Sequence, residues 1–163
     1  MRMIATSRHI PAPPEVVFGF LADLANHWSL IDRWTEIVAL EPHGRAATVR
    51  LRGPFGVRRV ARTRVLDAVS SRLLVGDARI GRTTVGRVRW VFTADDDGGT
   101  LVELSADVAA AGRLDRALLA LGARRWLRRR FADALVRLAA EMAAAPRVTM
   151  SAWCPPPSPA PSP

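Results

Sequence analysis

The sequence contains no lysine and no tyrosine, has one cysteine, and lacks any long hydrophobic run. A single cysteine cannot form an internal disulfide, so the fold must be stabilised by its apolar core. No apolar run approaches the roughly 18 residues that a membrane-spanning helix needs. The first residues alternate in polarity and do not form the apolar stretch of a secretory signal. We therefore expect a cytoplasmic protein.

All 24 basic residues are arginine, and the formal net charge is +9. A strongly basic chain is compatible with nucleic acid or an anionic membrane as a partner. The arginines are spread over the predicted strands and the last helix, and the few aromatic residues offer little for stacking on bases, which argues against nucleic acid. The stretch Arg124–Arg130 surrounds Trp126 with arginines. It is compatible with peripheral contact with an anionic membrane, and equally with a solvated helix face.

Length and composition favour one domain with a substantial core, because 49% of the 163 residues are apolar. Residues 2–10 alternate as a strand, and a helix is expected from Glu15, with Pro14 in its first turn. A second short helix or turn is expected around 26–31. The remaining strands are separated by turn residues and are predicted at 35–42, 46–52, 57–67, 71–79, 83–94 and 100–110.

A long helix is predicted over 113–144. Its second half presents an apolar stripe of Leu127, Phe131, Leu135, Leu138 and Met142. The first half runs on a different phase and Gly122 lies between the two, so a kink or break is expected there. Residues 146–163 are rich in proline, which predicts a disordered tail after a domain at 1–145.

The register of the last hairpin follows from its apolar and charged residues. On one face the predicted apolar pairs are Phe92–Val102, Trp90–Leu104 and Val88–Ala106. On the other face Arg87 meets Asp107, and a slip by one residue would bury these charges. We expect the outer arginines of this hairpin to pair weakly with its carboxylates.

The element order is a strand, two short helices, six strands and a long helix. This order resembles the START-like (SRPBCC) superfamily over about residues 2–144. The local signals are the front motif Ile10–Phe18, the pair Trp28 and Trp34, and the segments Val88–Phe92 and Gly98–Val102. The resemblance implies an α+β helix-grip fold, in which a curved seven-stranded antiparallel sheet wraps around the C-terminal helix and leaves a cavity between them. It also implies a small hydrophobic ligand. We expect no cofactor, because the sequence has no nucleotide-binding motif.

Polar residues near the expected cavity supply the candidates for chemistry. The chain has no nucleophile motif and no phosphate-binding loop, and its three histidines have no metal-ligand spacing, so no metal is expected. The acid–base candidates are His27, Asp32 and Arg33, each of which also fits an exposed structural role. Arg62 and Arg64 alternate on one strand, so they either form a solvated outer stripe or point inward toward ligand oxygens. The residues expected to line the cavity are Phe20, Trp28, Trp34, Arg62, Arg64, Val88, Trp90, Leu104, Leu127 and Phe131.

Three functions are compatible with these residues. The first is binding of a lipid, an isoprenoid or quinone, or a polyketide in the cavity. The second is an enzyme of the polyketide cyclase, aromatase or dehydratase type, in which one or two polar cavity residues act on a bound substrate. The third is a module that contacts a protein or membrane through the arginine-rich helix. We favour binding, because no catalytic set is visible in the sequence.

Overall fold

The computed structural model describes residues 3–30 and 35–144. Every strand and helix predicted within these ranges is present, with boundaries that differ by a few residues. The predicted tail at 146–163 lies outside the described residues, and the single domain at 1–145 stays a prediction. The elements are β1 (Ile4–Ile10), α1 (Pro14–Ala22), α2 (Leu24–Ser29), β2 (Thr35–Leu40), β3 (Ala46–Arg52), β4 (Arg58–Val69), β5 (Leu73–Ile80), β6 (Thr84–Ala94), β7 (Thr100–Ala110), α3 (Arg113–Leu118), a π-helical turn (Leu119–Ala123) and α4 (Arg124–Ala144).

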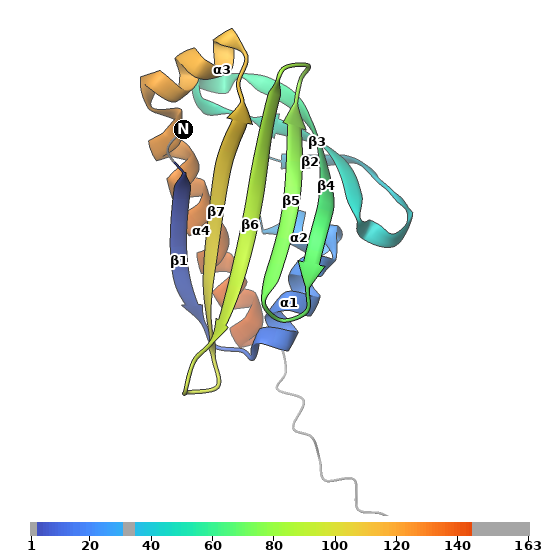
Figure 1. Ribbon diagram of the computed structural model, residues 1–163, viewed down its shortest axis with the longest axis vertical. Helices are drawn as coiled ribbons and strands as arrows, with labels where there is room; N and C mark the ends of the chain where they lie inside the picture. The colour runs from blue at the N-terminus through green and yellow to red at the C-terminus, as the bar shows by residue number, and fades with distance from the viewer. Residues whose placement is uncertain (1–2, 31–34, 145–163) are drawn as a thin grey trace, which may run out of the picture.

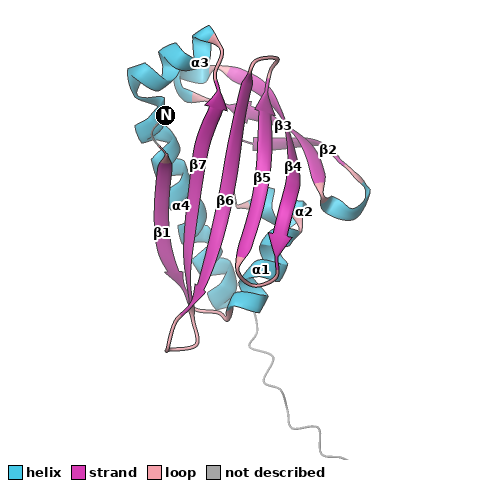
Figure 2. Ribbon diagram, viewed as in Figure 1, coloured by secondary structure: helices cyan, strands magenta, loops and turns pink. Residues whose placement is uncertain are grey.

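The strands form one antiparallel, seven-stranded sheet in the order β1-β7-β6-β5-β4-β3-β2 (Figure 1). Helices α1, α2 and α4 all lie on the same side of this sheet, and β2 and β3 bend toward that side (Figure 2). This arrangement confirms the predicted α+β fold, with a curved sheet and a long C-terminal helix. The side of the sheet that carries the helices is called the inner face below.

A continuous apolar core joins α4 to the inner face. Four of the five residues of the predicted stripe on α4 are buried and Leu127 is partly buried, because they recur every three or four positions along one side of the helix. The sheet contributes residues at alternate positions, as the pleat requires. Fully burying such a side chain stabilises the fold by about 1.5–3 kcal/mol. The buried core residues of α4 and the adjoining strands include Phe131, Leu135, Leu138, Met142, Trp90, Phe92, Val102 and Leu104.

The predicted register of the β6–β7 hairpin is confirmed at every pair named above, including Arg87 opposite Asp107 on the outer face. The weak ion pairing expected on this face is not observed between these two residues. Among the described residues, Arg87 and Asp107 form no ion pair with each other, because exposed charges gain little over their hydration. Other exposed arginines of the sheet do pair with carboxylates: Asp77 lies 3.1 Å from Arg64 and 4.0 Å from Arg79, and Glu36 lies 2.7 Å from Arg50.

Gly122 breaks the C-terminal helix where the sequence predicted it. Its φ of +105° lies in a region that glycine adopts without steric strain. The chain therefore turns a corner between α3 and α4 instead of continuing as one straight helix (Figure 1).

The two edges of the sheet differ in how they are covered. The β1 edge packs against α4. At the other edge, β2 exposes the apolar side chains of Ile37, Val38 and Leu40. A β-bulge between Ile37 and Ala39 shifts the pairing of β2 with β3 by one residue.

Candidate ligand-binding site

A cavity of about 70 Å³ lies between α2 and the middle of the sheet. Strands β4, β5 and β6 form its floor. No described residue of α4 lines it, which differs from the predicted position between the sheet and the last helix. The reason is that α4 packs chiefly along β1, at one edge of the sheet, whereas the cavity lies over β4, β5 and β6. The lining residues are Leu24, His27, Trp28, Thr63, Arg64, Val65, Leu74, Gly76, Asp77, Ala78, Val88 and Trp90.

The short helix α2 forms the roof of the cavity. Leu24, His27 and Trp28 are three and four residues apart, so they lie on one side of the helix and face the sheet. Asp23 caps the helix by accepting a hydrogen bond from the backbone N–H of Ala25 at 2.8 Å. The roof is thus held in place by local sequence at its first turn.

The cavity exists because β5 carries small residues where it passes beneath α2. Gly76 and Ala78 lie on the inner face, opposite Val88 and Gly86 of β6. A Cβ at position 76 would lie 3.1 Å from the carbonyl oxygen of Arg64, which is tighter than most Cβ contacts in proteins. Larger side chains at these positions would fill the space that the structure leaves open.

His27 is the titratable group most altered by the cavity wall. Its ring lies 5.3 Å from that of Trp28 and 5.2 Å from that of Trp90, with an edge-to-face geometry in both cases. Burial in these surroundings lowers the pKa of His27 from its ordinary 6.5 to about 4, because the charged imidazolium loses hydration. The imidazole is therefore neutral at pH 7.

Three polar atoms in this wall are buried without a hydrogen-bond partner in the described part of the chain. They are Nδ1 of His27, Nε1 of Trp28 and Nε1 of Trp90. Each indole nitrogen carries a donor and no acceptor. Leaving such a group unpaired costs about 1–3 kcal/mol, so most buried polar groups in proteins are hydrogen-bonded. A clustering of unpaired groups around one cavity is a reason to expect a ligand there.

Arg64 and Asp77 belong to the strands of the cavity floor, and their side chains lie on the outer face of the sheet. Nη2 of Arg64 donates to Oδ2 of Asp77 at 3.1 Å, and Nε donates to Oδ1 at 3.3 Å. This hydrogen bonding raises the pKa of Arg64 above its ordinary value. The guanidinium is exposed and already paired, so it does not present an inward cation to the cavity.

The structure brings together some of the predicted site residues and separates others. Trp28, Arg64, Val88 and Trp90 lie in the cavity wall, as does His27. Arg62 is exposed on the outer face, opposite Arg79, so the outer of its two predicted orientations is the one observed. Trp34, Asp32 and Arg33 lie outside the described residues. Their predicted roles, and the roles in binding of those in the wall, stay predictions.

The other predicted lining residues belong to the core around α4. Leu104 and Phe131 are buried there, and Phe20 and Leu127 pack against the same cluster. Sequence analysis missed Leu24, Thr63, Gly76 and Ala78, among others. The signal that pointed to the floor was present in β5, where small residues occupy alternate positions of an otherwise apolar strand face.

A curved seven-stranded antiparallel sheet with a long C-terminal helix and short helices after the first strand is a START-like fold. More specifically, a family model described as polyketide cyclase/dehydrase and lipid transport matches residues 1–143, and the chain belongs to this family. Members of the family usually bind hydrophobic ligands. No curated protein sequence matches the chain. Among the described residues, no helix is both long and apolar enough to cross a membrane.

Several solved structures share the fold at low sequence identity. A protein from Thermus thermophilus is 21% identical with a TM-score of 0.65, over 89% of this chain and 99% of that one. A START superfamily protein from Mycobacterium smegmatis is 15% identical with a TM-score of 0.65, over 86% and 98%. The Zhui aromatase/cyclase from a Streptomyces species is 20% identical with a TM-score of 0.64, over 87% and 93%. At these identities the similarity concerns the fold alone.

Proposed function

We propose that the protein binds a small hydrophobic molecule between α2 and strands β4–β6, and that this molecule carries at least one oxygen that accepts a hydrogen bond. The observation that supports the proposal best is the set of unpaired buried groups in the cavity wall. The indole N–H groups of Trp28 and Trp90 are donors that a carbonyl or phenol oxygen can satisfy once the rings turn toward the cavity. Aromatic rings around the cavity favour a flat, ring-shaped ligand.

The size of the cavity limits how such a ligand enters. At about 70 Å³ it is smaller than the roughly 150 Å³ cavity that admits benzene in an engineered protein. Side chains must therefore move on binding. Trp28 is the best placed to do so, because it is partly exposed and lies on a helix of only six residues. Among the three ligand types considered, an oxygenated ring such as a quinone or an aromatic polyketide fits the donors better than a plain acyl chain.

The residues of the cavity wall are better suited to binding a ligand than to catalysis. A general base works best when its pKa lies near the operating pH. The pKa of His27 lies near 4, so it accepts protons poorly at pH 7. Arg64 is already paired with Asp77. Within the described residues, the cavity therefore gathers no acid–base pair in position to act on a ligand.

A ring-forming or dehydrating enzyme is the second candidate, and one observation favours it. The Nδ1 atom of His27 has no partner, and its ring lies in the wall of the cavity. A neutral imidazole at this place can receive a proton from a bound substrate when the substrate also excludes water. The Streptomyces protein that shares the fold is named an aromatase/cyclase.

Tryptophan fluorescence with two probes tests the binding proposal. Menadione, a naphthoquinone with two carbonyl oxygens, should bind more tightly than naphthalene, which has the same rings and no oxygen. Ala78→Val fills the cavity floor and should weaken menadione binding about tenfold or more. The matched control is Ala109→Val at an exposed position of β7, which should bind as the wild type does. Unchanged binding by Ala78→Val would place the site elsewhere, and equal affinity for both probes would remove the oxygen requirement.

A turnover assay distinguishes the two candidate functions. The wild type and His27→Asn are incubated with a linear poly-β-ketone thioester, and ring closure is followed against buffer alone. Under the binding proposal neither protein accelerates ring closure. Acceleration by the wild type that His27→Asn abolishes, with menadione binding retained, would establish the enzyme instead.

A further inference from the structure

The end of the molecule opposite the β6–β7 turn carries a second surface, which does not depend on the cavity. The arginine-rich corner consists of residues 111–130, which include α3, the π-helical turn and the first turns of α4 (Figure 1). It contains seven arginines against one carboxylate, a formal charge of +6. This segment therefore holds most of the excess positive charge of the chain.

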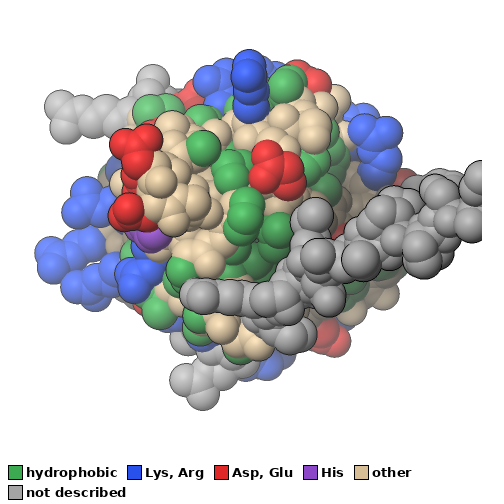
Figure 3. Space-filling view, turned by 90° about the horizontal axis from the view of Figure 1, so that it is seen from below, with side chains coloured by type: hydrophobic (Ala, Val, Ile, Leu, Met, Phe, Trp, Pro, Cys, Tyr) green, Lys and Arg blue, Asp and Glu red, His purple; other side chains and the backbone are tan. Residues whose placement is uncertain are grey.

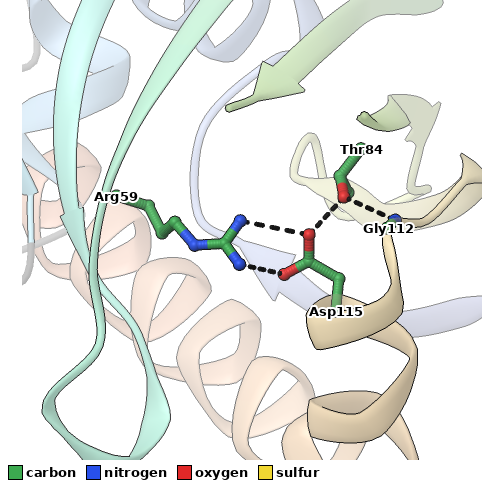
Figure 4. Close-up of polar contacts among 4 residues, drawn as sticks. All are labelled: Arg59, Thr84, Gly112 and Asp115. Carbon is green, nitrogen blue, oxygen red and sulfur yellow. Dashed lines mark hydrogen bonds and ion pairs between the residues drawn. The ribbon is translucent and has the colours of Figure 1, made fainter. Parts of the chain in front are cut away.

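The one carboxylate of the corner is turned inward. The guanidinium of Arg59 of β4 contacts both carboxylate oxygens of Asp115, at 3.0 and 3.1 Å (Figure 4). The hydroxyl of Thr84 also donates to Asp115. This hydroxyl in turn accepts a hydrogen bond from the N–H of Gly112 at 3.1 Å. The side chains of Arg59 and Asp115 are mostly buried. The network has two consequences. It anchors α3 firmly to the sheet, and it holds the carboxylate of Asp115 in mostly buried contacts with Arg59 and Thr84.

Two leucines of the corner face solvent. Leu114 is 53% exposed and Leu121 is 71% exposed, the largest value for a large hydrophobic residue in the described part of the chain. They are seven residues apart, and the intervening Ala117 and Ala120 are also exposed. Exposed apolar side chains rimmed by charge mark surfaces that bind a partner. The positive φ of Gly122 places the bend directly after Leu121, the more exposed of the two leucines.

Exposed arginines flank these leucines on both helices. On α4 they are three and four residues apart and lie on the side of the helix away from the core. An amphipathic helical segment that combines leucines with surrounding cations binds the interface of an anionic bilayer, where both groups are satisfied together. The exposed arginines are Arg113, Arg116, Arg125, Arg128 and Arg129.

We propose that the arginine-rich corner is a docking surface for an anionic lipid membrane, with Leu114 and Leu121 entering the headgroup region and the arginines contacting lipid phosphates. A nucleic acid would satisfy the arginines but would leave the leucines exposed, because sugar–phosphate backbones offer no apolar phase. The membrane is the partner that accommodates both. The docked residues extend beyond the Arg124–Arg130 stretch to include α3, whose leucines supply the apolar part of the contact.

The charge at the end of the molecule opposite the arginine-rich corner is consistent with docking through that corner. The β6–β7 turn there carries Asp95, Asp96 and Asp97 in a row. Figure 3 views this end, and acidic side chains lie at its edge. A molecule that docks through the arginine-rich corner holds this acidic turn away from the anionic surface.

Vesicle flotation with the full chain tests the proposal. Vesicles of phosphatidylcholine are compared with vesicles that also contain phosphatidylglycerol, at low and at high salt. The wild type should float with the anionic vesicles only, and salt should weaken but not abolish the binding. Wild-type protein that stays unbound in the presence of anionic vesicles at low salt overturns the proposal.

Two variants separate the apolar and charged parts of the contact. Leu114→Ser/Leu121→Ser should lower binding about tenfold or more, because the leucines no longer enter the bilayer. Arg125→Gln/Arg128→Gln/Arg129→Gln should lower it on the order of a hundredfold, at about fivefold for each arginine. Circular dichroism checks that both remain folded.

Matched controls guard against general effects of charge and polarity. Arg52→Gln/Arg87→Gln/Arg89→Gln removes three exposed arginines from other strands, and Leu40→Ser/Leu101→Ser replaces two exposed leucines elsewhere. Both should bind the anionic vesicles as the wild type does. If the arginine control loses as much binding as the corner variant, the attraction comes from net charge and the proposal fails. If Leu114→Ser/Leu121→Ser binds normally, no membrane insertion occurs and the proposal likewise fails.

Discussion

The inner face of the sheet is packed differently under its two helices. Under α4, Leu135 and Leu138 are almost completely buried and belong to one continuous core. Under α2, the same sheet borders a cavity and a group of unpaired polar atoms. The lengths of the helices explain the contrast, because α4 has 21 residues with a long apolar stripe and α2 has six. The long helix supplies stability, and the short one covers a site.

The largest effect is expected when one leucine is truncated under each helix, Leu138 under α4 and Leu24 under α2. Leu138→Ala removes a fully buried side chain from the dense half and should lower the free energy of unfolding by about 4–5 kcal/mol. Leu24→Ala, beside the cavity, should cost about 2–3 kcal/mol, because its side chain has fewer neighbours to lose. Urea unfolding measures both. Equal costs would show that the two halves are packed alike.

The second largest effect concerns His27 and pH. Its pKa is lowered in the folded chain, so between pH 6.5 and about 4 the unfolded chain binds a proton that the folded chain does not. Stability should therefore fall as the pH drops through this window, by up to about 3 kcal/mol from this group. His27→Phe should remove that part of the pH dependence, as measured by urea unfolding at a series of pH values. The control His9→Phe, exposed on β1, should keep it. Parallel curves for His27→Phe and the wild type would contradict the assignment.

The smallest effect is expected on the outer face of the sheet, at the ion pair between Arg64 and Asp77. Arg64→Gln removes the exposed partner of Asp77 and should lower the melting temperature only slightly, because solvent and salt screen such pairs. The loss should shrink further in high salt, as followed by thermal unfolding at two ionic strengths. A large, salt-independent loss would mean that Arg64 supports the cavity wall directly. Together the three measurements rank how much the core under α4, the buried imidazole of His27 and the Arg64–Asp77 pair contribute to stability.

Much of the fold could be predicted because the sequence determines local choices strongly. The hairpin register follows from Trp90 and Phe92 needing burial while Arg87 and Asp107 need solvent, and only one alignment meets both conditions. Gly122 was identifiable because the apolar phase of the helix slips there. The position of Trp28 and His27 near a cavity followed from the resemblance to the START-like superfamily.

The location of the cavity could not be predicted, and the reason is physical. Alternation shows which face of the sheet a residue occupies, but it does not show which helix covers which strands. Leu104 and Phe131 were expected in the cavity because they are apolar and face inward, yet α4 fills the space beside them. Gly76 and Ala78 create the cavity through the side chains they lack.

The bulge in β2 has a consequence for how the protein behaves when it is concentrated. An edge strand with exposed apolar residues is a template on which another copy can add a strand and begin aggregation. The bulge between Ile37 and Ala39 bends this edge, so that an incoming chain meets only short, misaligned stretches of hydrogen-bonding groups. One irregular residue pair thus protects solubility at the β2 edge of the sheet.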